Sequence, residues 1–176
     1  MKFHETELEG AYIIEFEKLE DNRGFFARTF CQQELQDHGL APTVAQANVS
    51  VNVKAGTLRG MHYQIAPYEE TKLIRCTRGA LYDVIIDLRP DSASYKRWIG
   101  VELTAENYKM LYVPANFAHG FITLEDNTEA IYFVSEFYTP GSERGLRWDD
   151  SHFNIKWPRS VDVISEKDAN WPDFAE

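Results

Sequence analysis

The chain has 176 residues, of which 44% are apolar, and a formal net charge of −10 at pH 7. This length supports one domain with a buried core, whereas the acidic charge disfavours a nucleic-acid binder, which needs clustered basic residues. The lack of a long apolar run, the charged first ten residues and the total of two cysteines disfavour a membrane span, a signal peptide and a disulfide framework. We therefore expect a single cytoplasmic domain over residues 1–176 that contacts neither membrane nor nucleic acid.

The first predicted element is a helix over residues 31–39, where good helix formers precede Gly39, a residue typical of a helix end. Seven strands rich in β-branched and aromatic residues follow, at residues 57–64, 71–77, 80–89, 97–103, 109–114, 119–124 and 129–138. These strands do not alternate with helices. The pattern indicates an all-β, antiparallel sandwich or jelly roll with one short N-terminal helix and minor helical turns, whose interior can hold a small ligand.

Side chains alternate between the two faces of a strand, and this alternation predicts which residues share a face. On residues 57–64, His62 and Arg59 fall on opposite faces. Lys72 falls with apolar neighbours, which is unusual for an amine on a solvent-exposed face. Tyr132 and Tyr138 share a face about 20 Å apart, so they could contact opposite ends of one elongated ligand.

His62 could hold a metal, move a proton or fill a strand. A cupin metal site needs about three convergent ligands, typically with two histidines separated by one residue on a strand. Position 64 is Gln, and His119 could supply one further ligand at best, so metal binding is disfavoured. A neutral imidazole is suited to act as a general base near neutral pH, although a lone histidine is more often a hydrogen-bonded core residue.

Other polar residues of the chain favour a role for His62 in proton transfer beside a carbonyl group. This chemistry needs a base, an acid and a group that stabilises an enolate oxygen. His62, Tyr132 and Lys72 are residues of these three types. Asp168 could orient the imidazole as a paired carboxylate does. The stretch from Ser165 to Asp168 also fits a helix N-cap followed by an acid in the first turn, and the residues alone favour that role.

Arginines are the candidates for binding phosphate. Residues 54–78 carry five basic and two acidic residues in an otherwise acidic chain, which suits a small anion. Arg59 lies there, and Arg23 lies in a predicted turn, where simple exposure is the alternative interpretation. The glycine-rich motifs of nicotinamide and ATP enzymes are absent, which favours chemistry done by side chains alone.

These residues stand in motifs that resemble the dTDP-4-dehydrorhamnose 3,5-epimerase family nearly end to end. The motifs are "DNRGFFARTF", "QANVS", "GTLRGMHYQ", "TKLIRCTRGALYDVIIDLR", "YVPANFAHGFITL", "IYFVSEFYTPGSERGLRWDD", "IKWP" and "ISEKD". The resemblance implies a cupin-like jelly roll without metal or redox cofactor, and a homodimer with exchanged strands. The implied reaction inverts C3 and C5 of a nucleotide-linked 4-keto-6-deoxyhexose, taking dTDP-4-dehydro-6-deoxy-D-glucose to dTDP-4-dehydro-L-rhamnose.

The same resemblance implies roles for individual residues. His62 is similar to the family's catalytic base, Asp168 to its paired carboxylate, Tyr132 to the acid on the opposite face of the sugar ring, and Lys72 to the lysine near the C4 carbonyl oxygen. The implied substrate-binding residues are Arg23, Gln46, Asn48, Arg59, Asp83, His119 and Tyr138. No metal ligand is implied.

A regular strand would keep Arg59 and His62 on opposite faces, whereas the resemblance places both at one substrate. We therefore predict a bulge or kink at Gly60. Position 28 is Arg, where many members of the family carry an acidic residue, and this departure bears on the identity of the nucleotide and sugar. Three alternatives stay open: an epimerase that inverts only C3 or only C5, a metal-dependent cupin that uses His62 and His119, and a non-catalytic sugar-nucleotide binding module.

Overall fold

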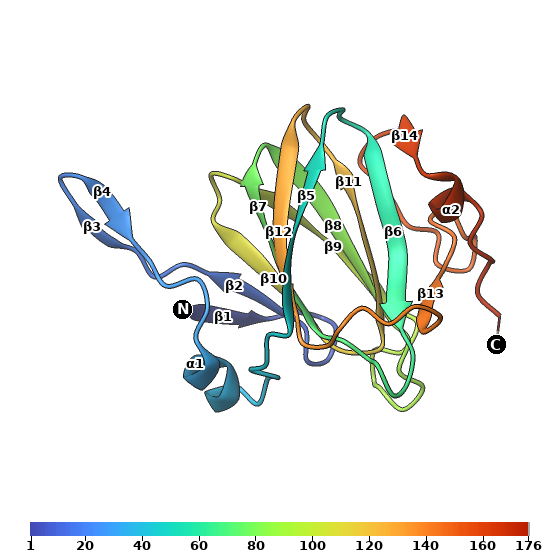
Figure 1. Cartoon of the computed structure of the whole chain (residues 1–176), viewed down its shortest axis with the longest axis horizontal. Coiled ribbons are helices and arrows are strands. Elements are labelled where there is room, and N and C mark those ends of the chain that lie inside the picture. Colours follow the sequence, from blue (N-terminus) through green and yellow to red (C-terminus); the bar gives the residue numbers. More distant parts are fainter. Residues whose placement is uncertain (176) are drawn as a thin grey trace.

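Two sheets that face each other form the body of the structure, a computed structural model that describes residues 1–175 (Figure 1). The first sheet contains, in spatial order, β1 (Lys2–Glu5), β2 (Tyr12–Glu15), β10 (Lys109–Val113), β7 (Lys72–Arg78), β12 (Thr128–Val134) and β5 (Gln46–Asn52). The second contains β13 (Glu143–Gly145), β6 (Thr57–Gln64), β11 (Phe117–Thr123), β8 (Ala80–Asp87) and β9 (Trp98–Thr104). The short β14 (Val163–Ile164) pairs with β6 in parallel, and neighbouring strands within each of these two orders pair antiparallel. The predicted all-β, cupin-like antiparallel jelly roll is confirmed.

The main core lies between the two sheets, where the inward side chains of both are apolar. Most of its members come from β7, β8, β9, β10 and β11, and include Ile74, Leu81, Leu103, Leu111 and Phe121. Alternation places these residues inward because every second side chain of a strand faces the same way. Burial of this apolar surface is the main term that holds the two sheets together.

A second cluster covers the outer face of the first sheet, where Leu35 of α1 (Gln32–Asp37) packs with Leu73 of β7. The predicted N-terminal helix is therefore confirmed, and it ends near Gly39, whose φ of +71° suits glycine. The other helix, α2 (Glu166–Ala169), is a single turn. Neither of these helices, in the part of the chain described, has the length and apolar character needed to cross a bilayer.

The seven predicted strands are all present. The largest difference is at β12, which ends at Val134 instead of residue 138. The expectation that Tyr132 and Tyr138 share the face of one strand was wrong, because the regular strand stops before it reaches Tyr138. The sequence did not predict β1 to β5, β13 or β14, which are short or lie at an edge of a sheet.

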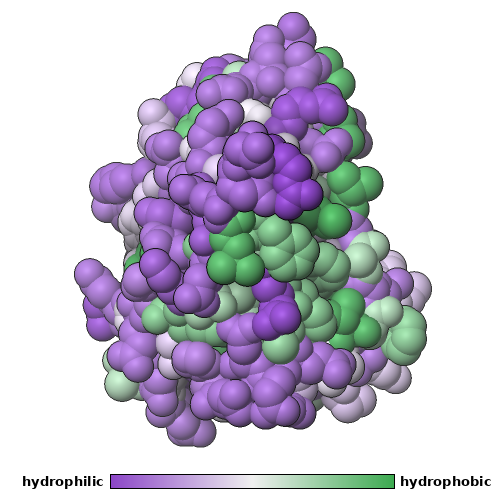
Figure 2. Space-filling view, turned by 90° about the vertical axis from the view of Figure 1, so that its left-hand side faces the viewer, coloured by the Kyte–Doolittle hydropathy of each residue, from purple (hydrophilic) through white to green (hydrophobic). Residues whose placement is uncertain are grey.

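A hairpin of β3 (Leu19–Asp21) and β4 (Gly24–Phe26) extends away from the two sheets (Figure 1). Its side chains are unusually exposed for apolar residues, with 66% of Leu19 and 69% of Phe26 accessible to solvent. Figure 2 looks onto the side of the molecule from which this hairpin extends and shows hydrophobic side chains at the surface among polar ones.

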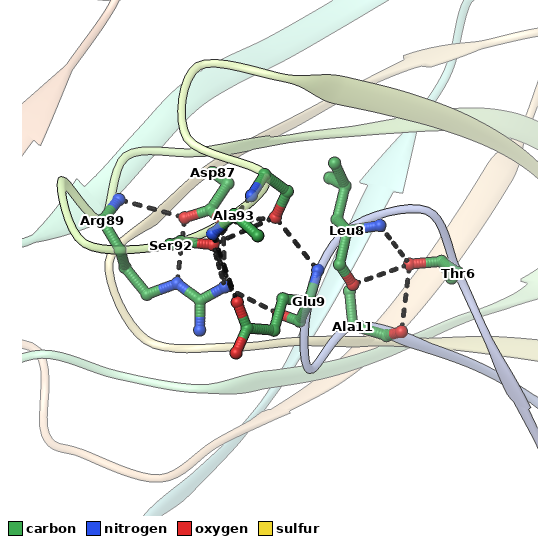
Figure 3. Close-up of polar contacts among 9 residues, drawn as sticks. Thr6, Leu8, Glu9, Ala11, Asp87, Arg89, Ser92 and Ala93 are labelled. Atoms are coloured by element: carbon green, nitrogen blue, oxygen red, sulfur yellow. Dashed lines mark hydrogen bonds and ion pairs between the residues drawn. The ribbon is translucent and has the colours of Figure 1, made fainter.

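The connection between β8 and β9 is fixed to the β1–β2 turn by a network around the buried Asp87 (Figure 3). Arg89 donates from Nε to Asp87 Oδ1 at 2.9 Å and from a terminal nitrogen to the Glu9 carbonyl at 2.6 Å. Burial acts to raise the pKa of Asp87, but hydrogen bonds from Arg89, Ser92 and Ser94 outweigh it and lower that pKa overall. The carboxylate therefore stays charged and holds the first sheet's turn to the second sheet.

Candidate active site

A bulge at Gly60 interrupts the pairing of β6 with β11. His62 pairs with His119 and Arg59 pairs with Phe121, so two residues of β6 stand opposite one residue of β11. Gly60 has a φ of +130°, and a Cβ built on it would lie 2.5 Å from the Gly120 Cα. Only glycine fits this close backbone approach. The predicted irregularity at Gly60 is confirmed.

The bulge changes which side chains of β6 share a face. Arg59 and His62 are three residues apart and would point in opposite directions from a regular strand. They line one cavity of about 300 Å³, which we call the Arg59 cavity. Its other lining residues come from both sheets and α2, and are Val49, Ser50, Val51, Lys72, His119, Phe121, Tyr132 and Asp168.

A second cavity of about 350 Å³, which we call the Tyr138 cavity, shares His62, Lys72 and Tyr132 with the first. Its remaining lining residues are Gln46, Asn48, Tyr63, Gln64, Glu70, Val134, Tyr138 and Glu143. Since three side chains belong to both cavities, an elongated ligand could occupy the two together. Three of the four residues predicted for chemistry thus lie where the two cavities meet, and the fourth, Asp168, lines the Arg59 cavity.

His62 and Asp168 form a paired base. His62 Nε2 lies 2.7 Å from Asp168 Oδ1, and only 5% of Asp168 is exposed. Burial acts to raise the pKa of Asp168, but its hydrogen bond and electrostatic interaction with His62, together with the hydrogen bond from the Gly60 amide, lower that pKa overall. A carboxylate only accepts hydrogen bonds, so Nε2 carries the proton and Nδ1 keeps the lone pair that can accept one.

Asp168 also has the second role that its sequence context predicted. Its backbone amide donates to Ser165 Oγ at 3.0 Å, which makes Ser165 the N-cap of α2. The cap fixes the first turn of the helix and with it the direction of the Asp168 side chain. The same residue therefore completes a helix terminus and binds the imidazole.

Tyr132 lies on β12 of the first sheet, whereas His62 lies on β6 of the second, and the cavities lie between the two strands. Burial raises the pKa of the Tyr132 hydroxyl, the negative charge of Glu70 raises it further, and the positive charge of Arg59 acts in the opposite direction. The hydroxyl is therefore protonated at neutral pH and can donate a proton. A base and an acid thus approach a bound ligand from different sheets.

Lys72 and Arg59 are the cations of this site. Lys72 is 8% exposed, and its Nζ donates to Glu70 Oε1 at 2.6 Å. Arg59 donates from Nε to Asn52 Oδ1 at 2.7 Å. The sequence analysis did not identify Glu70 or Asn52. Glu70 stands two residues before Lys72, a spacing that places both on one face of an extended segment and could have indicated the pair.

His119 and Asp83 form a second imidazole–carboxylate pair. His119 Nε2 lies 2.6 Å from Asp83 Oδ1, and Asp83 is fully buried. The other carboxylate oxygen of Asp83 has no hydrogen-bond partner among the residues described. His119 lines the Arg59 cavity, and Asp83 stands behind it on β8.

The structure brings most of the predicted substrate-binding residues to the two cavities. Gln46, Asn48 and Tyr138 line the Tyr138 cavity, and the Tyr138 amide donates to Gln46 Oε1 at 2.8 Å. Arg23 is different, since it lies in the β3–β4 turn with 86% of its side chain exposed. Its guanidinium pairs with Asp21 at 2.5 Å, and it lines neither cavity of its own chain.

Further groups that the sequence analysis missed lie around α2. Lys167 forms an ion pair with Glu143, which lines the Tyr138 cavity, and Trp171 packs edge-on against His62 with ring centroids 6.1 Å apart. Trp171 also fills the space beside Gly145, where a Cβ would lie 2.3 Å from the indole. Within residues 1–175, no group of three or more His, Cys, Asp or Glu side chains is placed to hold a metal ion.

Residues 5–176 match the family model of the dTDP-4-dehydrorhamnose 3,5-epimerases. The chain belongs to this family. Among the curated epimerases, that of Sinorhizobium fredii (strain NBRC 101917 / NGR234) is 40% identical over 177 residues, covering 100% of this chain and 91% of the relative.

Solved structures of 3,5-epimerases are similar over nearly the whole chain. The dTDP-4-dehydrorhamnose 3,5-epimerase of Elizabethkingia anophelis NUHP1 superimposes with a TM-score of 0.96 at 37% identity, covering 99% of this chain and 96% of that one. The dTDP-6-deoxy-D-glucose-3,5-epimerase of Legionella pneumophila Philadelphia 1, solved in complex with dTDP-4-keto-L-rhamnose, gives 0.90 at 32% identity, covering 98% and 92%. The family and fold implied by the sequence motifs are therefore confirmed.

Proposed function

We propose that this chain is a cofactor-independent epimerase that inverts C3 and C5 of dTDP-4-dehydro-6-deoxy-D-glucose and forms dTDP-4-dehydro-L-rhamnose. The observation that carries the proposal is the placement of His62, paired with its own carboxylate, and Tyr132 on opposite sheets around shared cavities. Inversion requires that a proton leaves one face of the ring and another arrives at the opposite face. A site with a base and an acid on different sheets meets that requirement.

The reaction begins when His62 Nδ1 takes the proton from C3 or C5. Both carbons flank the C4 carbonyl, so either deprotonation moves the carbon–hydrogen electron pair into an enolate whose charge lies on the same oxygen. Tyr132 then gives its hydroxyl proton to the carbon from the other face, which re-forms the carbonyl and inverts the centre. His62 returns its proton to solvent and Tyr132 recovers one, so the enzyme is unchanged after each inversion.

Two cations can stabilise the enolate oxygen. The Lys72 ammonium carries three donors, of which one is used by Glu70, and the Arg59 guanidinium keeps its terminal nitrogens free of Asn52. Loss of one preorganised donor to a developing oxyanion typically lowers kcat by about 10²- to 10³-fold. We assign Lys72 to the C4 oxygen, with His119 and its Asp83 partner beside it in the Arg59 cavity.

We assign the nucleotide to the Tyr138 cavity. Gln46, Asn48 and Tyr138 supply polar and aromatic groups there, and the Legionella relative was solved with a dTDP-linked sugar of the same class. Binding of the nucleoside and diphosphate fixes the sugar between His62 and Tyr132, which contributes to catalysis through orientation.

We further propose that the enzyme acts in the cytoplasm as a single-domain, metal-free homodimer that exchanges strands. Support comes from the edge strand β5, where Val49 and Val51 are 61% and 52% exposed, and from the exposed Leu19 and Phe26 of the β3–β4 hairpin. A partner that covers these groups would bury apolar surface on both chains. Arg23 would then contact the diphosphate in the partner's site. A molar mass twice that of the chain in light scattering supports the dimer, and a monomer contradicts it.

The function is tested by incubating the protein with dTDP-4-dehydro-6-deoxy-D-glucose in D2O. Deuterium at both C3 and C5, read by NMR, is the expected result. Label at one position indicates an epimerase that inverts a single carbon, and no label contradicts the proposal. Activity that is lost on chelation and restored by a divalent ion would contradict the metal-free part.

A further inference from the structure

Glu70 is a partly buried acid in the cavity wall for which the proposed reaction has no use. Its side chain is 13% exposed, and its Oε1 accepts a hydrogen bond from Lys72 Nζ at 2.6 Å. Both side chains line the Tyr138 cavity together with Tyr132. Charged groups this far from solvent are costly unless they are paired, so the ion pair fixes both partners.

Lys72 needs such a partner because its side chain is long and flexible. A lysine ammonium is a point charge on a four-carbon stem, and its position is set by the acceptors around it. Glu70 accepts a hydrogen bond from the Lys72 ammonium, and Lys72 lies at the junction of the two cavities. With one donor held by Glu70, two ammonium donors remain for a ligand.

We propose that Glu70 is a positioning residue for the epimerisation, which holds the Lys72 ammonium beside Tyr132 so that cation and acid act on one enolate. This inference rests on the proposed function. Glu70 acts through Lys72 and Tyr132 and exchanges no proton with the sugar.

The negative charge of Glu70 has a second consequence at Tyr132. After burial, it is the strongest influence that raises the pKa of the hydroxyl. Tyr132 donates only while it is protonated, so inversion is lost as the pH rises through its pKa. A charge that raises the pKa extends the active range toward higher pH, and its removal shortens that range.

Other titratable groups also face Tyr132 across the cavities. Arg59, His62 and Tyr63 come from β6, His119 from β11 and Asp168 from α2. Tyr138 and Glu143 come from the segment that ends in β13. Of these, Arg59 acts on the pKa of Tyr132 and lowers it. When Glu70 is removed, the effect of Arg59 is no longer opposed by the charge of Glu70. The pKa of Tyr132 is therefore expected to fall.

The test compares Glu70→Gln with the wild type and with a matched control, Glu69→Gln. The control removes the neighbouring acid, and Glu69 is not among the groups that shift the pKa of Tyr132. Glu70→Gln is expected to lower kcat for inversion by about 10-fold, less than the loss of a direct oxyanion donor, with KM nearly unchanged. The alkaline limb of its pH profile is expected at lower pH than in the wild type. Glu69→Gln is expected to match the wild type in both measurements.

Glu70→Asp separates position from charge, because it keeps the carboxylate and withdraws it by one methylene. It is expected to lower kcat while the alkaline limb stays closer to that of the wild type than in Glu70→Gln. Wild-type kcat and an unmoved alkaline limb in Glu70→Gln would overturn the inference, as would an equal shift in Glu69→Gln. A wild type that exchanges no deuterium would instead overturn the proposed function, so the two failures are distinguishable.

Discussion

The second sheet and the β3–β4 hairpin differ in how their charged side chains are partnered. On the second sheet, His62 and His119 each bind a carboxylate that is almost or fully buried, and both pairs are complete within one chain. On the hairpin, Arg23 is 86% exposed, and its guanidinium pairs with its neighbour Asp21. The difference teaches that the chemical groups are held in place by buried pairs within the chain, whereas Arg23 of the hairpin lies outside both cavities.

The largest expected effect is at His62. His62→Ala removes the base and is expected to abolish deuterium exchange at C3 and C5, with a loss of about 10⁴-fold or more in kcat. The cavity is otherwise intact, so dTDP binding measured by calorimetry is expected to stay within a few-fold of the wild type. Exchange at the wild-type rate would show that another group is the base and that the pair is structural.

Asp168→Asn is expected to lower kcat by about 10³-fold, because the amide no longer selects the tautomer that leaves Nδ1 free. The Ser165 cap uses the backbone amide of residue 168 and persists in the variant. The paired carboxylate has a lowered pKa in the folded state, so its contribution to stability is complete above the ordinary Asp pKa and is lost as the pH falls through the lower folded value. Thermal unfolding at several acidic pH values checks that this loss is absent in Asp168→Asn.

Gly60→Ala tests the bulge that joins Arg59 to His62 at one cavity. The added Cβ would meet the Gly120 Cα at 2.5 Å in a backbone conformation with φ of +130°. We expect a loss of about 2–3 kcal/mol in the free energy of unfolding, together with reduced activity. Chemical denaturation measures the first quantity. A variant as stable and as active as the wild type would mean that the bulge is dispensable.

The smallest expected effect is at Arg23, which lies on the hairpin. Arg23→Ala is expected to leave stability unchanged and to raise KM by about 10-fold, the loss of one charge-assisted phosphate contact. Steady-state kinetics with the dTDP sugar measures this effect. In a mixed dimer, one protomer carries His62→Ala, so only the site of the other protomer is active. Arg23→Ala placed on one chain or the other then shows which chain's Arg23 serves that active site. A KM equal to that of the wild type would show that the hairpin does not bind the diphosphate.

The sequence predicted the parts of the fold in which alternation and burial agree. The strands at residues 57–64 and 80–89 carry apolar residues packed on one or both faces, and both are present. The β3–β4 hairpin was missed because its strands have three residues each and bury none of them. β5 was missed because its apolar residues Val49 and Val51 lie on the exposed face of the strand. The alternation of apolar and polar residues there does not mark a buried face.

Prediction of the site depended on register as well as on residue type. His62, Tyr132, Lys72 and Asp168 were named from their chemistry and their motifs, and they meet at the cavities. Contacts between different elements, such as Asn52 with Arg59, depend on loop geometry that residue types do not encode. The bulge at Gly60 was predictable because a regular strand conflicted with the placement of Arg59 and His62 at one ligand.

The central claim, that a base and an acid act from opposite faces, is tested most directly by Tyr132→Phe in D2O. This variant keeps His62 and its carboxylate and removes only the hydroxyl that reprotonates the ring. We predict that the substrate proton still exchanges with solvent while inversion at C3 and C5 falls by about 10²- to 10³-fold, as NMR of the recovered sugar would record. Equal losses of exchange and inversion, or inversion at the wild-type rate, would contradict the account.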